Sequence, residues 1–190
     1  MTRKDDTIYV LRTCNADMTS HGGFKYPKRG AVEAPDWRDD DQCGGGLHGL
    51  PWGVGDATLP NSSDDAVWQV IHVRVSDGYQ HGTGGLIGKC KFRRGTVVYT
   101  GTRDGAIAYL DAHGAADKPV VFAVRISGYR GTSTSGDEGT STSGEGGTLI
   151  IKYYDGARYR IAVGYIGENG LKPNTPYRLN DNHEFEEVPA

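Results

Sequence analysis

The chain has 190 residues, with 21 lysines and arginines against 24 aspartates and glutamates, which gives a formal net charge of −3. A balance this close to neutral supplies no strong attraction to nucleic acid or to an anionic membrane surface. No apolar run is long enough for a transmembrane helix, and no apolar segment follows the charged start as a secretory signal would require. The three cysteines, an odd number, favour a reducing compartment over a disulfide framework. We therefore expect a soluble, cytoplasmic protein without a membrane partner.

Glycine is abundant, at 29 residues against 8 prolines, which indicates many tight turns rather than a disordered chain. Between the turns, short segments rich in β-branched and aromatic residues are expected to be strands. In chain order these segments are residues 7–13, 67–75, 97–100, 120–126, 148–154 and 159–163. Residues 106–113 are the one expected helix, with Asp104 as its N-cap and Gly114 after its C-terminus. The predicted fold class is mainly β, with an antiparallel sheet or barrel-like domain.

The regular pattern disappears between residues 31 and 60, a stretch that holds two of the three tryptophans and many glycines. A loop of this length without secondary structure is usually either functional or disordered. Disordered segments are poor in aromatic residues. We therefore expect an ordered loop whose Trp37 and Trp52 pack onto the body of the protein.

An internal repeat with a period of eight residues occupies residues 128–151. The first two octads end in Gly-Thr-Ser-Thr-Ser, and the third becomes apolar at its end. A strict short period is typical of stacked β-coils, so the repeat predicts a short β-solenoid or an extended hairpin. The alternative is a mobile linker rich in glycine, serine and threonine. The repeat separates an N-terminal mainly-β domain (1–127) from a C-terminal β-hairpin cap (152–190), which we expect to pack with that domain as one unit.

His48 lies in a glycine-rich stretch, and glycine lets the backbone approach a ligand closely. Leu47, Leu50 and Trp52 could form the walls of a small pocket around it. The alternative is that the His48 side chain hydrogen-bonds to neighbouring backbone and fixes the loop.

A Cys₃His set would use every cysteine in the chain, because Cys14, Cys43, His48 and Cys90 are all possible zinc ligands. The chain has only a Cys-x4-His pair and no Cys-x-x-Cys knuckle. Simple burial of the cysteines is therefore the favoured interpretation, with a reactive thiol as a further alternative. We predict neither a metal site nor a cofactor.

Basic residues cluster at Lys89, Lys91, Arg93 and Arg94. Such a cluster could bind a phosphate or a nucleotide, but four charges near a turn more often form a solvated face. The acidic net charge argues against nucleic acid as a partner. No hydrolase signature occurs, so no catalytic residue is assigned. The candidate binding residues are Cys43, His48, Trp52, Lys89 and Arg93.

Four segments together resemble an uncharacterised family of bacterial, prophage and phage proteins: residues 22–27, the Cys-x4-His element at 43–48, the octads and residues 155–179. That family carries an N-terminal domain with such an element, a Gly-x-x-Gly-Thr-x-Thr-Ala type repeat and a β-hairpin cap. The repeat is also similar to the Ala-Gly-Tyr-Gly-Ser-Thr coils of ice nucleation proteins. The resemblance implies a phage or mobile-element context, and it brings no catalytic residues.

A flat, hydroxyl-rich β surface without catalytic motifs suits contacts rather than turnover. We therefore expect a non-enzymatic binding protein, encoded by a phage or prophage, that acts on a host or phage protein, for example as a host-defence modulator. An exposed strand edge in the repeat also predicts a homo-oligomer. The alternative is an enzyme, or a small-ligand or nucleotide-binding protein, with a pocket built around the Gly44–Gly55 loop.

Overall fold

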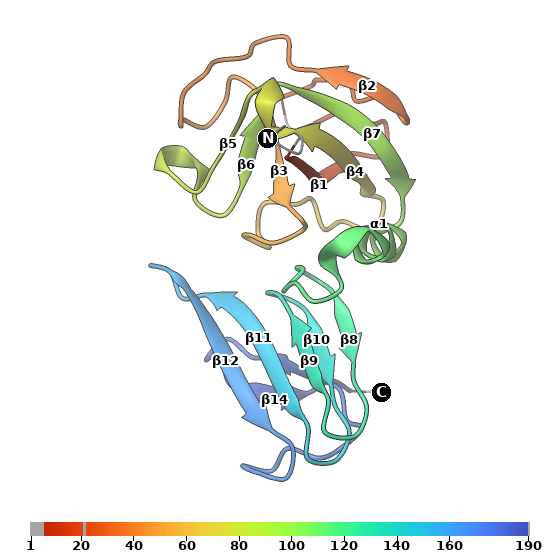
Figure 1. Ribbon diagram of the computed structural model, residues 1–190, viewed down its shortest axis with the longest axis vertical. Helices are drawn as coiled ribbons and strands as arrows, with labels where there is room; N and C mark the ends of the chain where they lie inside the picture. The colour runs from red at the N-terminus through yellow and green to blue at the C-terminus, as the bar shows by residue number, and fades with distance from the viewer. Residues whose placement is uncertain (1–5, 21, 190) are drawn as a thin grey trace, which may run out of the picture. The chain divides into compact units, whose positions relative to one another are not determined.

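The computed structural model describes residues 6–20 and 22–189, which divide into two compact units (Figure 1). Unit 1 runs to Ala116, and unit 2 begins at Asp117, before the first octad. The predicted mainly β fold is confirmed, and the sheets are open rather than closed into a barrel. Within the described part of the chain, no helix has the length and apolar character that crossing a membrane requires.

Unit 1 contains β1 (Thr7–Cys14), β2 (Gly30–Glu33), β3 (Leu47–Pro51), β4 (Val67–Arg74), β5 (Tyr79–His81), β6 (Cys90–Phe92), β7 (Arg94–Gly101) and α1 (Arg103–Leu110), with short helical turns η1 (Val75–Asp77), η2 (Gly84–Leu86) and η3 (Asp111–Ala115). Unit 2 contains β8 (Val124–Ile126), β9 (Thr132–Ser135), β10 (Thr140–Thr142), β11 (Thr148–Tyr154), β12 (Tyr159–Tyr165), β13 (Tyr177–Leu179) and β14 (Phe185–Glu187).

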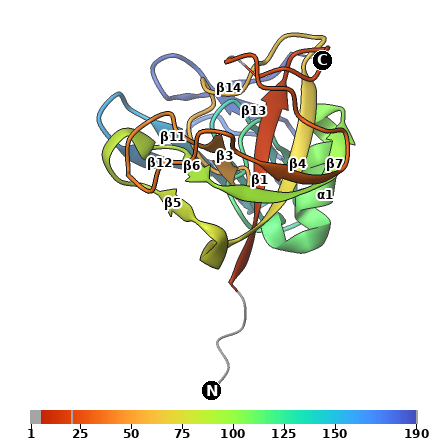
Figure 2. The ribbon, with the colours of Figure 1, turned by 90° about the horizontal axis from the view of Figure 1, so that it is seen from above.

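The strands of unit 1 pair antiparallel in the order β2-β7-β4-β1-β3-β6-β5. The central strands β1 and β4 carry the apolar pattern seen in the sequence, and Val10, Leu11 and Ile71 are fully buried. Helix α1 packs against β4 and β7, with Ala106 and Leu110 buried. Figure 2 shows β1, β4 and β7 side by side, with α1 beside β7. Apolar burial around the two central strands therefore stabilises unit 1.

Helix α1 begins three residues earlier than predicted, and its N-cap is Thr102 rather than Asp104. The Thr102 hydroxyl accepts a hydrogen bond from the Gly105 amide at 3.3 Å, which satisfies one of the free amides of the first turn. The helix ends at Leu110, where the chain continues into η3. Gly114 in that turn has a φ of +107°, in the left-handed region that glycine adopts readily.

The prediction that residues 31–60 lack regular structure is wrong, because this stretch contains β3 and most of β2. Gly49 explains why the sequence pattern conceals β3. A Cβ at Gly49 would lie 2.4 Å from Val10 Cγ1 and 2.6 Å from the Leu11 carbonyl oxygen, so only glycine lets β3 lie this close to β1. Glycine weakens strand propensity, and here the pairing of β3 with β1 and β6 overrides that weakness.

Unit 2 contains a short β-solenoid in which one coil comprises two octads. β8 pairs in parallel with β10, where Val124 faces Thr140, and β9 pairs in parallel with β11, where Thr132 faces Thr148. β8 and β10 belong to one sheet with β13 and β14, whereas β9 and β11 belong to another with β12. Of the forms predicted for the repeat, the structure has the solenoid and not the hairpin, because the repeat strands pair in parallel.

The Gly-x-x-Gly part of each octad is a turn at a corner of the coil. At all three corners the amide of the second glycine donates to the carbonyl of the first, at 2.9–3.1 Å. The residue before the second glycine has a positive φ: +53° at Arg130, +57° at Glu138 and +66° at Gly146. A positive φ at this place is the property of a type II turn. Each octad is thus one such turn followed by one strand.

The C-terminal strands cover one end of the solenoid. β12 pairs antiparallel with β11, and β13 pairs antiparallel with both β10 and β14. A small apolar cluster of Leu149, Ile166, Leu171 and Tyr177 is buried there, with Phe185 packed against it. At the other end, β8 and β9 are the last strands of their sheets in the described chain.

Candidate functional site

Threonines occupy the outward positions of β9 and β10. Successive side chains of a strand point to opposite faces, so the buried Ser133 and Ser141 direct their neighbours outward. The neighbours are Thr132 and Thr134 on β9, and Thr140 and Thr142 on β10. The first two octads therefore each present a Thr-x-Thr pair, and the two pairs lie on different sheets.

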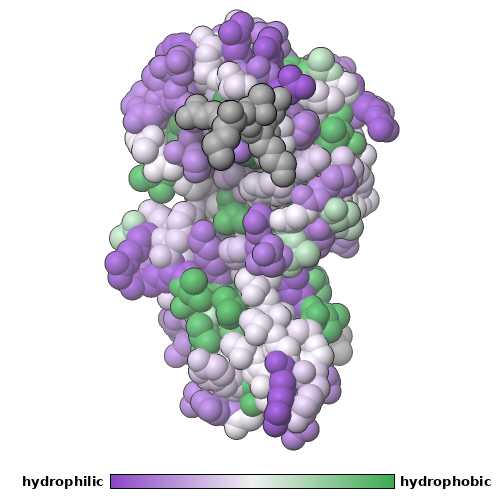
Figure 3. All heavy atoms as spheres, viewed as in Figure 1, coloured by the Kyte–Doolittle hydropathy of each residue, from purple (hydrophilic) through white to green (hydrophobic). Residues whose placement is uncertain are grey.

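Both surfaces also carry apolar side chains. On the sheet of β8 and β10, the exposed Val124 and Ile126 lie in register with Thr140 and Thr142. The other surface is that of β9, β11 and β12. In register with Thr132 lie Thr148 on β11 and Tyr165 on β12, and in register with Thr134 lie Ile150 and Val163. We call these six residues the threonine face. Val163 is 48% exposed, Tyr165 is 54% exposed, and the adjoining Ile161 is 62% exposed. Figure 3 shows hydrophobic side chains gathered over β11 and β12.

The inward positions form a serine network that holds the two sheets together. Ser135 on β9 and Ser141 on β10 share a hydrogen bond of 3.0 Å. The Ser127 hydroxyl donates to Ser143 Oγ at 2.8 Å, and Ser143 donates to the Gly131 carbonyl at 2.9 Å. Buried hydroxyls that are paired in this way avoid the cost of desolvation. The network therefore fixes the spacing of the outward threonines.

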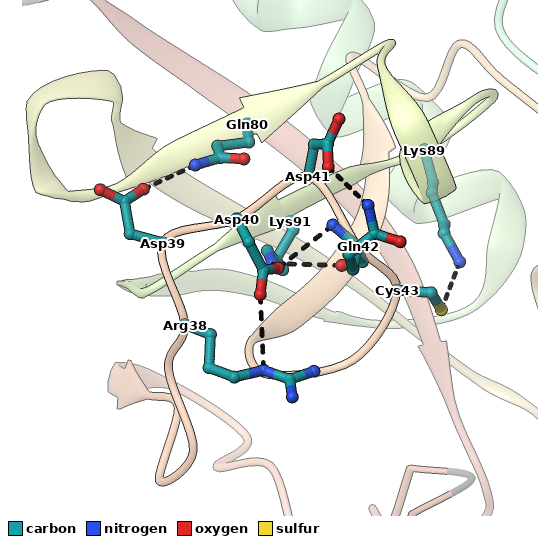
Figure 4. A network of polar contacts seen from close by, with 9 residues as sticks. All are labelled: Arg38, Asp39, Asp40, Asp41, Gln42, Cys43, Gln80, Lys89 and Lys91. Carbon is teal, nitrogen blue, oxygen red and sulfur yellow. Dashed lines mark hydrogen bonds and ion pairs between the residues drawn. The ribbon is translucent and has the colours of Figure 1, made fainter.

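In unit 1, the glycine-rich loop is anchored by a buried lysine (Figure 4). Lys91 on β6 is fully buried, and its ammonium donates to Asp40 Oδ1 at 2.5 Å and to the Gln42 carbonyl at 3.1 Å. Arg38 lies on the other carboxylate oxygen of Asp40, at 3.7 Å. The hydrogen bond from Lys91 is the main cause that lowers the pKa of Asp40.

Cys43 is an exposed thiol beside a lysine ammonium. Lys89 Nζ lies 2.9 Å from Cys43 Sγ, and this hydrogen bond lowers the thiol pKa (Figure 4). The other two cysteines are buried, and burial raises their pKa, to about 12 for Cys90. Because the thiolate is the nucleophile, we expect Cys43 to react faster than the two buried cysteines.

At neutral pH, iodoacetamide should alkylate Cys43 faster than Cys14 or Cys90, as measured by mass spectrometry of timed digests. Lys89→Met should slow alkylation at Cys43, because its thiolate loses the neighbouring positive charge. Lys28→Met, which removes an exposed lysine elsewhere in unit 1, should leave the rate unchanged. An equal rate in wild type and Lys89→Met would show that the lysine does not activate the thiol.

The structure brings three of the five predicted binding residues together. Cys43, His48 and Lys89 line one cavity of about 980 Å³, whose lining includes neither Trp52 nor Arg93. Trp52 is half-buried and packs edge-on against Tyr9, with ring centroids 5.4 Å apart. Whether these residues bind a ligand stays a prediction.

Arg93 and the other basic residues of its cluster have partners within the chain. Arg93 Nε pairs with Glu33 at 3.2 Å, and Arg94 pairs with Asp77 at 2.9 Å. Lys89 and Lys91 make the contacts with Cys43 and Asp40 described above. The four residues therefore form separate local pairs rather than one basic patch.

The Cys₃His set is not assembled. Cys14 donates to Gln69 Oε1 at 3.4 Å, Cys90 donates to the Gly49 carbonyl at 3.3 Å, and Cys43 contacts Lys89. Within the residues that the structure describes, no three His, Cys, Asp or Glu side chains converge as a metal site.

Two features of the structure were not predicted from the sequence. One is Arg12, a buried cation on β1 that lines the same cavity as His48. A charged residue inside the apolar run 8–14 was the available signal. The other is the outward threonines of the octads, which the period alone does not distinguish from the inward serines.

Comparison with known proteins gives one group of relatives. No protein-family model matches the chain, and no solved structure matches it. The chain is 36% identical over 108 residues to an ice nucleation protein of Xanthomonas campestris pv. translucens, covering 57% of this chain and 7% of the relative. It is 35% identical over 112 residues to ice nucleation protein InaU of Pantoea ananas, covering 59% and 10%. A Pseudomonas syringae ice nucleation protein is 36% identical over 110 residues, covering 58% and 9%. The matched part thus spans a tenth or less of these relatives.

These matches correct several expectations. Because the relatives are ice nucleation proteins, the interpretation as a phage- or prophage-encoded protein that acts on a host or phage protein is wrong, including the role of host-defence modulator. The similarity to ice nucleation proteins also shows that the predicted cytoplasmic location is wrong. The matches support neither a phage origin nor the Cys-x4-His element as a family feature, but they agree with the resemblance of the octads to ice nucleation coils.

Proposed function

We propose that unit 2 is an ice-binding module whose contact surface is the threonine face. The observation that carries the proposal is the alignment of Thr132 with Thr148, and of Thr134 with Ile150, on adjacent parallel strands. Parallel strands lie about 4.8 Å apart, so hydroxyl and methyl groups repeat at a fixed short spacing. The similarity to proteins named for ice nucleation supports the same assignment.

The chemistry of this surface suits contact with ordered water. A threonine hydroxyl can donate one hydrogen bond and accept others, as a water molecule does. The threonine methyls, Ile150 and Val163 offer no hydrogen bonds, so they do not compete with the water lattice. The serine network and the corner turns hold the array rigid, which reduces the entropy that binding would otherwise cost.

The threonine face of the described residues is small. The structure has two parallel strands on the threonine face, plus β12 from the cap. We therefore propose that the threonine face of these residues attaches to ice.

The test is inhibition of ice recrystallisation by wild type and by lysine variants. Thr134→Lys, which places a charge within the threonine face, should abolish the inhibition. Thr96→Lys, at an exposed strand position in unit 1, is the matched control and should retain it. Thr142→Lys lies on the other sheet and should retain most of the activity. Circular dichroism identifies any variant that fails to fold. Wild type that inhibits no better than albumin, or Thr134→Lys with full activity, would refute the proposal.

The homo-oligomer expected from the sequence stays a prediction. Among the described strands, β8 and β9 each have one unpaired edge, which is the feature that prompted it. Pairing of these edges with a second copy would lengthen the array of outward threonines.

A further inference from the structure

The proposed ice binding by unit 2 leaves the cavity of about 980 Å³ in unit 1 without an assigned role. β1, β3, residues 43–46 and residues 58–61 contribute to its lining. Among the charged residues of that lining are two cations, Arg12 and Lys89, and one carboxylate, Asp36. The volume is that of a small-molecule site.

Arg12 is an unusual residue for the interior of a strand. It is 8% exposed, and its guanidinium carbon lies 3.4 Å from the ring centroid of Tyr26. Nη1 donates to the His48 carbonyl at 3.3 Å, and Nη2 donates to the Thr13 carbonyl at 3.0 Å. In the described chain, Nε has no hydrogen-bond partner, and the guanidinium forms no ion pair with a carboxylate.

A buried guanidinium without a counter-charge is costly, because carbonyl dipoles replace only part of its lost hydration. Arginine presents its donors in a planar fork that matches carboxylate and phosphate oxygens. An anion in the cavity would therefore supply the missing charge and the partner for Nε.

His48 adds a second unsatisfied group to the same lining. Its Nε2 is buried and has no hydrogen-bond partner in the part of the chain that the structure describes. Burial, followed by the charges of Lys89, Lys91 and Arg12, lowers the pKa of His48 to about 4. The imidazole is therefore neutral at pH 7 and offers either a donor or an acceptor, according to its tautomer.

We propose that this cavity binds a small organic anion, whose carboxylate or phosphate group pairs with the Arg12 guanidinium while a neighbouring polar atom hydrogen-bonds to His48 Nε2. Lys89 contributes a further positive charge to the lining. The site is independent of the threonine face, so failure of either proposal leaves the other standing.

The experiment titrates ¹⁵N-labelled full-length protein with inorganic phosphate in one arm and succinate in the other, with sodium chloride at matched ionic strength as the reference. The proposal predicts a saturable shift of the His48 Nε2 resonance in at least one arm, and none with chloride. The arm that saturates at lower concentration identifies the anion class. No saturable shift with either probe would overturn the proposal, and this readout needs no variant.

Variants then test the role of Arg12. Arg12→Gln should weaken binding of the effective probe about tenfold or more, because charge-assisted hydrogen bonds are lost. Arg12→Lys keeps the positive charge but loses the planar pair of guanidinium donors, so it should weaken binding of the probe less than Arg12→Gln does. Arg93→Gln, an exposed arginine outside the cavity, should bind as wild type does. Unchanged affinity in a folded Arg12→Gln would also overturn the assignment.

Discussion

Replacing Leu149 with alanine is expected to lower the free energy of unfolding of unit 2 by about 2–5 kcal/mol, because it removes a buried side chain and leaves a cavity. Leu149 is fully buried, and it belongs to a small apolar cluster with Ile166, Leu171 and Tyr177. On β9 and β10 the inward residues are serines, which contribute little apolar burial, so the apolar burial of the octad strands comes from Leu149 and Ile151 on β11. A loss of this size is a large share of the stability of a small unit.

Hydrogen exchange measured by mass spectrometry separates unit 2 from unit 1. In Leu149→Ala, amides of β9, β10 and β11 should exchange faster by the factor that corresponds to the lost free energy, while β1 and β4 stay protected. Ile161→Ala, which truncates an aliphatic side chain that is 62% exposed, is the matched control and should change exchange little. Unchanged protection in Leu149→Ala would contradict the assignment of this cluster as the core of unit 2.

Replacing Lys91 with alanine should destabilise unit 1 by about 2–4 kcal/mol. The substitution removes a fully buried stem that packs between Gly46 and Trp37, and it removes the donor to Asp40 and Gln42. The estimate lies below the cost of breaking a fully buried pair because the Asp40 side chain that remains is 39% exposed.

Lys91→Met keeps an apolar side chain of similar length but removes the ammonium, so it separates the contribution of the charge from that of packing. It should destabilise less than Lys91→Ala at pH 7. Lys91 lowers the folded-state pKa of Asp40, so this contribution is present above the unfolded aspartate pKa of about 3.9 and is lost as the pH falls through the folded value. The melting-temperature difference between wild type and Lys91→Met should therefore shrink on acidification below pH ~4. A difference that is constant with pH would show that the ion pair contributes no stability.

The sequence predicted the strands that bury a regular apolar pattern, and these form the centre of each unit. The segments expected at 7–13, 67–75, 148–154 and 159–163 correspond closely to β1, β4, β11 and β12. The short strands β3 and β6 were not predictable. Gly49 in β3 is required by the closeness of β1, and Lys91 in β6 is buried only because Asp40, fifty-one residues away, pairs with it.

In the octads, too, one part of the structure was predictable from the sequence and another part was not. Their period predicted a stacked coil, because each octad repeats one turn and one strand. The period could not show that a coil holds two octads, since this depends on Val124 pairing with Thr140 rather than with Thr132. The segment before Gly128 lacks the repeat motif, yet its β8 is part of the first coil.

The sequence predicted only those residues of the candidate site that lie in a stretch of unusual local composition. The glycine-rich stretch around His48 does line a cavity, together with Cys43 and Lys89. Arg12 reaches the same cavity from a strand thirty-six residues earlier than His48. That approach follows from the pairing of β1 with β3, which no local pattern reports.

The most direct test of the central claim is whether the protein itself adsorbs to ice. A fluorophore attached at Cys43 lies in unit 1, outside the proposed contact surface, and marks the protein without altering that surface. A single ice crystal grown slowly in a solution of the labelled protein should take up fluorescence on discrete crystal planes, as a rigid periodic surface requires. Uniform exclusion of the label from the growing crystal would contradict ice binding by unit 2.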